Sequence, residues 1–206
     1  MFLAPVLDLV TGHNPWLQGR GLGADAAEVA RIGAAFVRGV EAAGVVATAK
    51  HFPGHHDMDG DPAICVATVS GGAVELLPGM IPFRAAIKAG ARAVMTGPAL
   101  VPGLDVGMPS SLSAPTIARL RDDLGFAGLV VSDDLDAAGT LRAQRDVPGA
   151  AVAVLRAGSD LLLLSAANDL AQVSARILAA VAGGSLPESR LAKAAARVRA
   201  LADSTG

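Results

Sequence analysis

The chain has 206 residues, of which 52% are hydrophobic and 17% are charged, and its formal net charge at pH 7 is −2. This length suits one domain with a sizeable core, and the apolar composition excludes a disordered chain. The small net charge gives no electrostatic support for binding nucleic acid, and the single cysteine, Cys65, excludes a disulfide framework within the chain.

Five apolar segments predict β-strands, and each is followed by a segment with the signals of a helix. In chain order, the strands are expected at residues 2–7, 45–49, 93–96, 128–132 and 161–164. Continuous apolar runs are typical of parallel strands that are buried on both faces. The alternation of strands and helices predicts a parallel sheet with right-handed crossovers, either an open doubly wound sheet or a barrel.

The helices that follow these strands are marked by their end signals. The first is expected to begin at Asp25, which starts a capping-box-like sequence, and to stop at Gly44. The next helices are expected at residues 76–89, 113–125 and 150–157. Asn168 is expected to cap a helix that runs to about residue 182, and Ser185 to open a final helix through a second capping box.

Two polar runs directly follow predicted strands. Residues 50–55 are Lys-His-Phe-Pro-Gly-His, and residues 132–136 are Ser-Asp-Asp-Leu-Asp. Ligands of α/β folds bind at the carboxyl ends of the strands, so we expect a functional site that contains both runs. On these residues alone a second interpretation stays open, in which Ser132 and Asp133 cap the next helix.

Both runs resemble glycoside hydrolase family 3, and they are most similar to its β-N-acetylglucosaminidase branch. Residues 3–8, Asn14, Pro15 and Arg20 fit the same family in the same order, so the resemblance covers nearly the whole chain. It implies a (β/α)8 TIM-barrel-like catalytic domain, with residues 1–206 forming a single domain. The family barrel begins upstream of the first strand found here, so we expect an N-terminally truncated barrel with about the last five βα units.

The resemblance also implies an activity, namely retaining hydrolysis of β-linked hexosaminides, with N-acetylated sugars as the expected class. No cofactor and no metal ion are expected for this reaction. Asp133 matches the catalytic nucleophile of the family. The positions that match substrate-binding residues are Arg20, Lys50, His51 and His55.

The segment that follows the first polar run departs from the family pattern. The family branch carries an Asp-Ser-His tripeptide there, and its His is the general acid/base. Asp61 matches the Asp, whereas Pro62 and Ala63 stand at the positions of the Ser and the His. We therefore expect Asp61 or His56 to serve as the catalytic acid, or else the chain is a catalytically impaired relative that binds sugars.

Other polar and aromatic residues near the predicted site have ambiguous roles. Asp134 and Asp136 are expected to point elsewhere, because successive residues of a strand alternate between its faces. His13 and Trp16 are expected to pack in the loop after the first strand.

A third function stays open because of the histidine cluster. His51, His55 and His56 have side chains of a type that binds zinc, so a metal-dependent hydrolase is an alternative.

The expected partner is a carbohydrate substrate, and neither nucleic acid nor a membrane is expected. In a truncated barrel the first and last strands have unpaired edges, which favour self-association. No apolar run is long enough to span a membrane, and the N-terminus lacks the basic segment of a signal peptide. We therefore expect a cytoplasmic protein, although any signal upstream of Met1 would be absent from this sequence.

Overall fold

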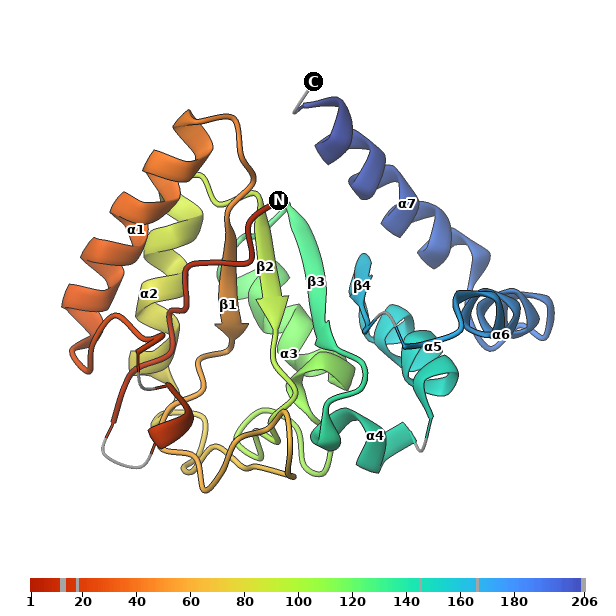
Figure 1. The fold of residues 1–206 in the computed structure, drawn as a ribbon, viewed down its shortest axis with the longest axis horizontal. Coiled ribbons are helices and arrows are strands. Elements are labelled where there is room, and N and C mark those ends of the chain that lie inside the picture. The colour runs from red at the N-terminus through yellow and green to blue at the C-terminus, as the bar shows by residue number, and fades with distance from the viewer. Residues whose placement is uncertain (12–13, 18, 145, 166, 205–206) are drawn as a thin grey trace.

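The computed structural model of the protein describes residues 1–11, 14–17, 19–144, 146–165 and 167–204, in which four strands form one parallel sheet (Figure 1). In their order across the sheet, the strands are β1 (Thr48–Phe52), β2 (Ala93–Thr96), β3 (Leu129–Asp134) and β4 (Leu161–Leu163). The α-helices are α1 (Ala26–Ala42), α2 (Leu77–Lys88), α3 (Ala114–Ala118), α4 (Ala138–Gln144), α5 (Val147–Ala157), α6 (Leu170–Ala182) and α7 (Glu188–Asp203).

The first predicted strand is present as an irregular extended segment beside β1. Phe2 and Val6 form parallel bridges with Ala47 and Lys50. Pro5 interrupts the regular pairing because it has no N–H to donate, although its carbonyl accepts a hydrogen bond from Lys50 N at 3.1 Å. The segment therefore occupies a fifth strand position at the edge of the sheet.

The second predicted strand is placed too early in the sequence. It was expected to end at Ala49, but β1 continues through the polar residues Lys50 and His51 to Phe52. Pairing with β2 sets this end, because Phe52 lies opposite Thr96. The predicted strands near β2, β3 and β4 agree with the structure to within two residues.

The two faces of the sheet pack against different helices. Val94 of β2 belongs to an apolar cluster that includes Phe83 of α2, whereas its neighbour Met95 lies in a second cluster on the opposite face. Val198 and Leu201 of α7 pack against this second cluster. Figure 1 shows α1 and α2 side by side along β1, with α7 near the amino ends of the strands.

This arrangement is a partial (β/α) barrel. Within the described residues, the N-terminal segment and β4 each have a neighbouring strand on one side only. The loops that follow the strands gather at the carboxyl ends of the sheet, at the bottom of Figure 1. No helix in the described ranges combines the length and the apolar character needed to cross a membrane.

The helix ends test the capping predictions. Asp25 caps α1 as predicted, since its carboxylate accepts a hydrogen bond from a backbone N–H of the first turn at 2.8 Å. The other two predictions were wrong. Asp169 rather than Asn168 caps α6, and α7 begins only after Pro187, because the Ser185 hydroxyl instead donates to a carbonyl of α6.

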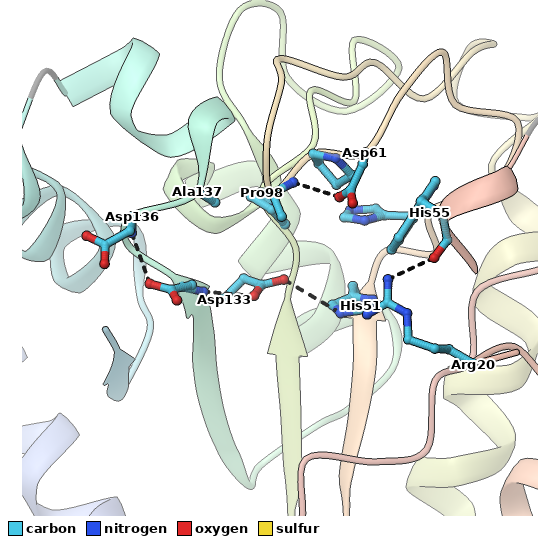
Figure 2. A pocket seen from close by; sticks show the side chains of 12 residues that line it. Arg20, His51, His55, Asp61, Pro98, Asp133, Asp136 and Ala137 are labelled. Atoms are coloured by element: carbon cyan, nitrogen blue, oxygen red, sulfur yellow. Dashed lines mark hydrogen bonds and ion pairs between the residues drawn. The ribbon is translucent and has the colours of Figure 1, made fainter. Parts of the chain in front are cut away.

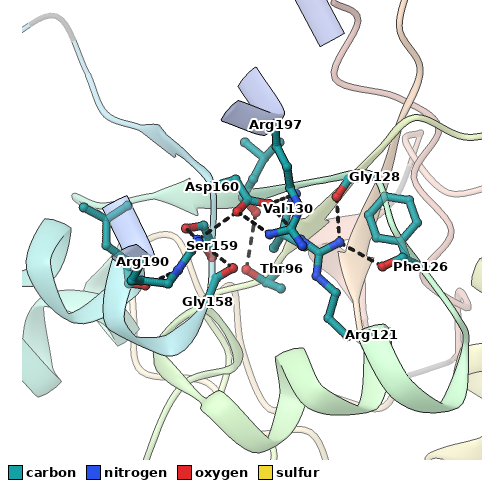
Figure 3. A network of polar contacts seen from close by, with 12 residues as sticks. Thr96, Arg121, Phe126, Gly128, Val130, Gly158, Ser159, Asp160, Arg190 and Arg197 are labelled. Carbon is teal, nitrogen blue, oxygen red and sulfur yellow. Dashed lines mark hydrogen bonds and ion pairs between the residues drawn. The ribbon is translucent and has the colours of Figure 1, made fainter. Parts of the chain in front are cut away.

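A buried ion-pair network lies at the amino end of β4 (Figure 3). The carboxylate of Asp160 is inaccessible to solvent and accepts hydrogen bonds from Arg121, Arg190 and Arg197 at 2.7, 2.8 and 3.1 Å. The backbone N–H of Val130 also donates to it at 3.1 Å. The network therefore ties α7 and the π-helical segment Arg119–Asp123, which continues α3, to the edge of the sheet.

Candidate active site

A cavity of about 170 Å³ lies at the carboxyl ends of β1 and β3 (Figure 2). Arg20, His51, His55, Asp61 and Asp133, which the sequence nominated for the site, all line it. The structure thus brings the two polar runs and the loop after β1 together around one space.

Asp133 lies near the end of β3 and faces His51 of β1. The Asp133 Oδ2 atom is 3.6 Å from His51 Nε2, and the Asp133 side chain is 20% exposed. Its other oxygen accepts a hydrogen bond from the backbone N–H of Asp134 at 2.8 Å. A carboxylate held in this way is fixed in direction and remains accessible from the cavity, as attack on a substrate requires.

Asp8 lies behind His51 and was missed as a site residue by the sequence analysis. It is fully buried, and its Oδ2 atom is 2.6 Å from His51 Nδ1. Burial alone would raise the pKa of Asp8, but the charge and hydrogen bond of His51, together with His55, hold that pKa below its ordinary value. In the sequence Asp8 is the polar end of an apolar strand and belongs to residues 3–8, which fit the family, but neither signal assigned it a role.

His55 is also fully buried, yet it lines the cavity. Its ring stacks on that of His51, with ring centroids 5.6 Å apart and planes 8° from parallel. Neither ring nitrogen of His55 has a hydrogen-bond partner among the described residues. Burial is the largest effect on this group and lowers its pKa to about 4, so the ring is neutral at pH 7, and both of its nitrogens are themselves buried.

Arg20 and Lys50 bring positive charge to the same end of the sheet. The Arg20 guanidinium lies 5.1 Å from the centre of the Trp16 ring and donates to the Trp16 carbonyl at 3.1 Å. Burial lowers the pKa of the Lys50 ammonium, and Arg20 adds to this effect, while the carboxylate of Asp133 counteracts it. Lys50 is thus electrostatically coupled to Asp133, although it is not part of the cavity wall described above.

The loop after β1 contributes Asp61, Pro62 and Ala63 to the cavity. One oxygen of Asp61 accepts a hydrogen bond from the backbone N–H of Ala63 at 3.0 Å. Figure 2 shows Asp61 above the strand ends, whereas Asp133 lies at the end of β3. Asp61 and Asp133 therefore reach the cavity from different elements, the loop after β1 and the end of β3.

His56 is placed differently from the other nominated residues. Its Nδ1 atom lies 3.2 Å from the carbonyl oxygen of Gly54, and its ring packs against Gly79 of α2. A Cβ atom at Gly79 would lie only 2.9 Å from that nitrogen. Of the two residues considered as the acid, Asp61 lines the cavity and His56 does not.

The prediction placed neither Asp134 nor Asp136 at the site, yet both line the cavity; their carboxylates nevertheless have partners of their own, and that of Asp134 accepts a hydrogen bond from the backbone N–H of Asp136 at 3.0 Å. Asp134 is the last residue of β3 and Asp136 lies in the turn that follows, so strand alternation applies only to Asp134. Burial raises the pKa of Asp134. The Asp136 carboxylate accepts hydrogen bonds from the amide nitrogen of Asn168, with distances of 3.0 and 2.7 Å to its two oxygens.

The two residues expected to pack near the first strand have different outcomes. Trp16 does pack against the core, but it also lines the cavity and tilts against the rings of His51 and His55. His13 lies outside the described residues.

One group of metal-binding type occurs within the described ranges. Asp8, His51 and His55 bring a carboxylate oxygen and ring nitrogens within 4.8 Å of one another. His56, which the metal hypothesis includes, is not part of this group. The Asp8 oxygens, moreover, already accept hydrogen bonds from both other residues.

Comparison with known proteins decides the family. Residues 1–201 match the glycosyl hydrolase family 3 N-terminal domain. The chain belongs to glycoside hydrolase family 3. The family domain is TIM-barrel-like, so the predicted fold class, a partial barrel of this type, is confirmed.

Members of this family with similar sequences are named for activity on hexosaminides. The beta-hexosaminidase LpqI of Mycobacterium tuberculosis is 32% identical over 203 residues, which cover 95% of this chain and 52% of that protein. A beta-N-acetylglucosaminidase/beta-glucosidase of Cellulomonas fimi is 35% identical over 219 residues, covering 98% of this chain and 38% of that protein. The chain therefore spans about half the length, or less, of these two curated relatives.

Solved structures of family 3 enzymes share the fold. The family 3 beta-N-acetylglucosaminidase from Paenibacillus sp. strain FPU-7 superposes with a TM-score of 0.90 at 35% identity, over 98% of this chain and 39% of that chain.

Proposed function

We propose that this family 3 protein hydrolyses β-linked hexosaminides, with N-acetylated sugars as substrates, through a covalent intermediate on Asp133. The observation that carries the proposal is the Asp133 carboxylate, which lies near the end of β3 in the cavity and faces His51 at 3.6 Å. A retaining glycosidase needs a carboxylate that attacks the anomeric carbon and later departs from it. The names of the relatives support the sugar class.

The polar groups around the cavity suit a neutral polyol. Arg20 and Lys50 donate hydrogen bonds, and a neutral histidine can donate from one ring nitrogen and accept at the other. Sugar hydroxyls both donate and accept, so they can satisfy these groups, while Trp16 offers an aromatic wall.

Asp61 is the proposed acid. In the first step Asp133 bonds to the anomeric carbon, the glycosidic bond breaks, and Asp61 gives its proton to the leaving oxygen. In the second step Asp61 takes a proton from water, which attacks the anomeric carbon and releases Asp133. Asp61 is chosen over His56 because it lines the cavity and His56 does not.

Paired variants test this assignment. Asp61→Asn is expected to slow hydrolysis of a natural glycoside by about 10²–10⁴-fold and to affect an activated aryl glycoside far less, since a good leaving group needs no acid. His56→Gln is the matched control and is expected to leave both rates unchanged. Replacing Pro62→Ser and Ala63→His together should bring the rate of hydrolysis of the natural glycoside closer to that of the activated aryl glycoside. If His56→Gln instead lost activity on the natural glycoside and kept it on the activated one, His56 would be the acid.

A catalytically impaired, sugar-binding relative is the second candidate. It is favoured by Ala63, which places no proton donor at the family's acid/base position. Measuring N-acetylglucosamine binding by calorimetry alongside hydrolysis of the activated glycoside distinguishes this candidate from an active glycosidase. Binding without turnover of the activated glycoside would support the impaired relative, and absence of both would refute a role in sugar chemistry.

A metal-dependent hydrolase is favoured only by the Asp8, His51 and His55 group. Dialysis against EDTA tests it. The glycosidase mechanism predicts unchanged turnover after metal removal, because both of its steps use only the carboxylates of Asp133 and Asp61 and a water molecule. Loss of activity that zinc restores would support the metal-dependent hydrolase.

Self-association through the open strand edges is a further part of the proposal. The N-terminal edge exposes Phe2 and Leu3, and edges of apolar strands recruit other strands. Light scattering after size exclusion is expected to show oligomers or aggregates. A monomer that unfolds in one cooperative transition would contradict this expectation. A cytoplasmic location stays a prediction.

A further inference from the structure

Asp8 is the most completely engaged buried carboxylate near the site, and the mechanism above gives it no role. Its Oδ1 atom accepts hydrogen bonds from the backbone N–H groups of His55 at 2.7 Å and His51 at 3.2 Å. Its Oδ2 atom lies 3.3 Å from His51 N and 2.6 Å from His51 Nδ1. Buried charges require such partners, and these bind Asp8 to both histidines of the polar run.

The contact with the ring identifies which nitrogen carries a proton. An ionised carboxylate can only accept, so the 2.6 Å contact requires an N–H at His51 Nδ1. The low pKa of Asp8 agrees with an ionised group. The hydrogen bond made by one ring nitrogen sets the state of the other. The remaining nitrogen, Nε2, is the one that faces Asp133 at 3.6 Å.

We propose that Asp8 is a positioning residue, which holds His51 with the proton on Nδ1 and directs Nε2 toward Asp133 and the substrate. Asp8 does not line the cavity, so it acts through His51. Its hydrogen bonds to two backbone N–H groups fix the carboxylate relative to β1, and the 2.6 Å contact then fixes the ring. What the ring does to a sugar rests on the proposed function, but the placement of the proton does not.

The hydrogen bonds of Asp8 predict the effect of replacing it with asparagine. The backbone N–H groups of His51 and His55 need an acceptor, so the Asn carbonyl oxygen takes the place of Oδ1. The Asn NH₂ group then occupies the place of Oδ2 and points at His51 Nδ1. An NH₂ group can only donate, so His51 must accept at Nδ1 and move its proton to Nε2.

Nitrogen NMR of the imidazole rings tests the proposal without any need for turnover. The chain has four histidines, so the His51 ring can be assigned by its loss in His51→Gln. In the wild-type protein the His51 Nδ1 signal should lie in the protonated range. In Asp8→Asn it should move to the unprotonated range, with Nε2 becoming protonated.

Two control variants make the result specific. Asp59→Asn removes a carboxylate of the loop after β1, which accepts a hydrogen bond from the backbone N–H of Thr68, and Asp133→Asn removes the carboxylate on the Nε2 side of the His51 ring. Both should keep the proton on Nδ1. A wild-type ring protonated at Nε2 alone, or an unchanged ring in folded Asp8→Asn, would overturn the proposal. If Asp8→Asn does not fold, the wild-type and Asp133→Asn spectra decide it. Failure of hydrolysis with a correctly placed proton would count against the proposed function only.

Discussion

Acidification is expected to destabilise the protein through His55. Burial lowers the pKa of this ring from 6.5 to about 4, so the unfolded chain takes up its proton at a higher pH than the folded protein does. The stabilisation is therefore fully present above about pH 6.5 and is lost as the pH falls toward 4. One pKa unit is worth about 1.4 kcal/mol, so the loss is about 3 kcal/mol of unfolding free energy.

Urea unfolding monitored by circular dichroism between pH 7.5 and pH 4 measures this effect. The difference in unfolding free energy between the wild-type protein and His55→Gln should shrink by about 3 kcal/mol across this range. His56→Gln is the control, because His56 is the adjacent histidine and is only partly buried. A difference that stays constant with pH would refute the reasoning and show that His55 titrates alike in both states. Asp8 does not interfere, since its lowered pKa confines its own effect to below about pH 3.8.

Two further predictions concern stability, and the same unfolding measurement checks both. Gly97→Ala places a Cβ atom 1.9 Å from the buried ring of His55 and should lower the unfolding free energy by about 1–3 kcal/mol. The control is Gly39→Ala in α1, where the new Cβ atom has no neighbour within 4 Å, and it should raise the unfolding free energy by about 0.5–1 kcal/mol. Equal effects of the two variants would contradict the close contact. Asp160→Asn leaves three guanidinium groups without their carboxylate and should cost about 3–5 kcal/mol, whereas a change below 1 kcal/mol would show that the network is not stabilising.

Local signals made parts of the fold predictable. The bounds of α1 follow from Asp25 and Gly44, which act on the backbone within one turn, and the predicted and observed ends agree within two residues. The end of β1 is set instead by pairing with β2, more than forty residues away. The polar side chains of Lys50 and His51 therefore led to a predicted strand end that was too early. Strand ends that depend on distant partners cannot be derived from local sequence.

The site residues likewise include some that local sequence reveals and others that depend on distant contacts. Asp133 and His51 could be nominated because each lies in a run whose residue types and order are distinctive. Asp8 was missed because its role exists only through contacts with residues 43 and 47 positions away. The position of Asp136 could not be derived from strand alternation, because this residue lies in the turn after the end of β3.

The central claim is that Asp133 is the nucleophile of a glycosidase, and the most direct test is the rate at which Asp133→Ala hydrolyses an activated aryl N-acetyl-β-glucosaminide. The account predicts that turnover falls on the order of 10³-fold or more relative to the wild-type protein, as it does when an essential catalytic group is lost. Because the leaving group needs no acid, this loss cannot be attributed to the altered loop around Ala63. Turnover equal to that of the wild-type protein would contradict the account.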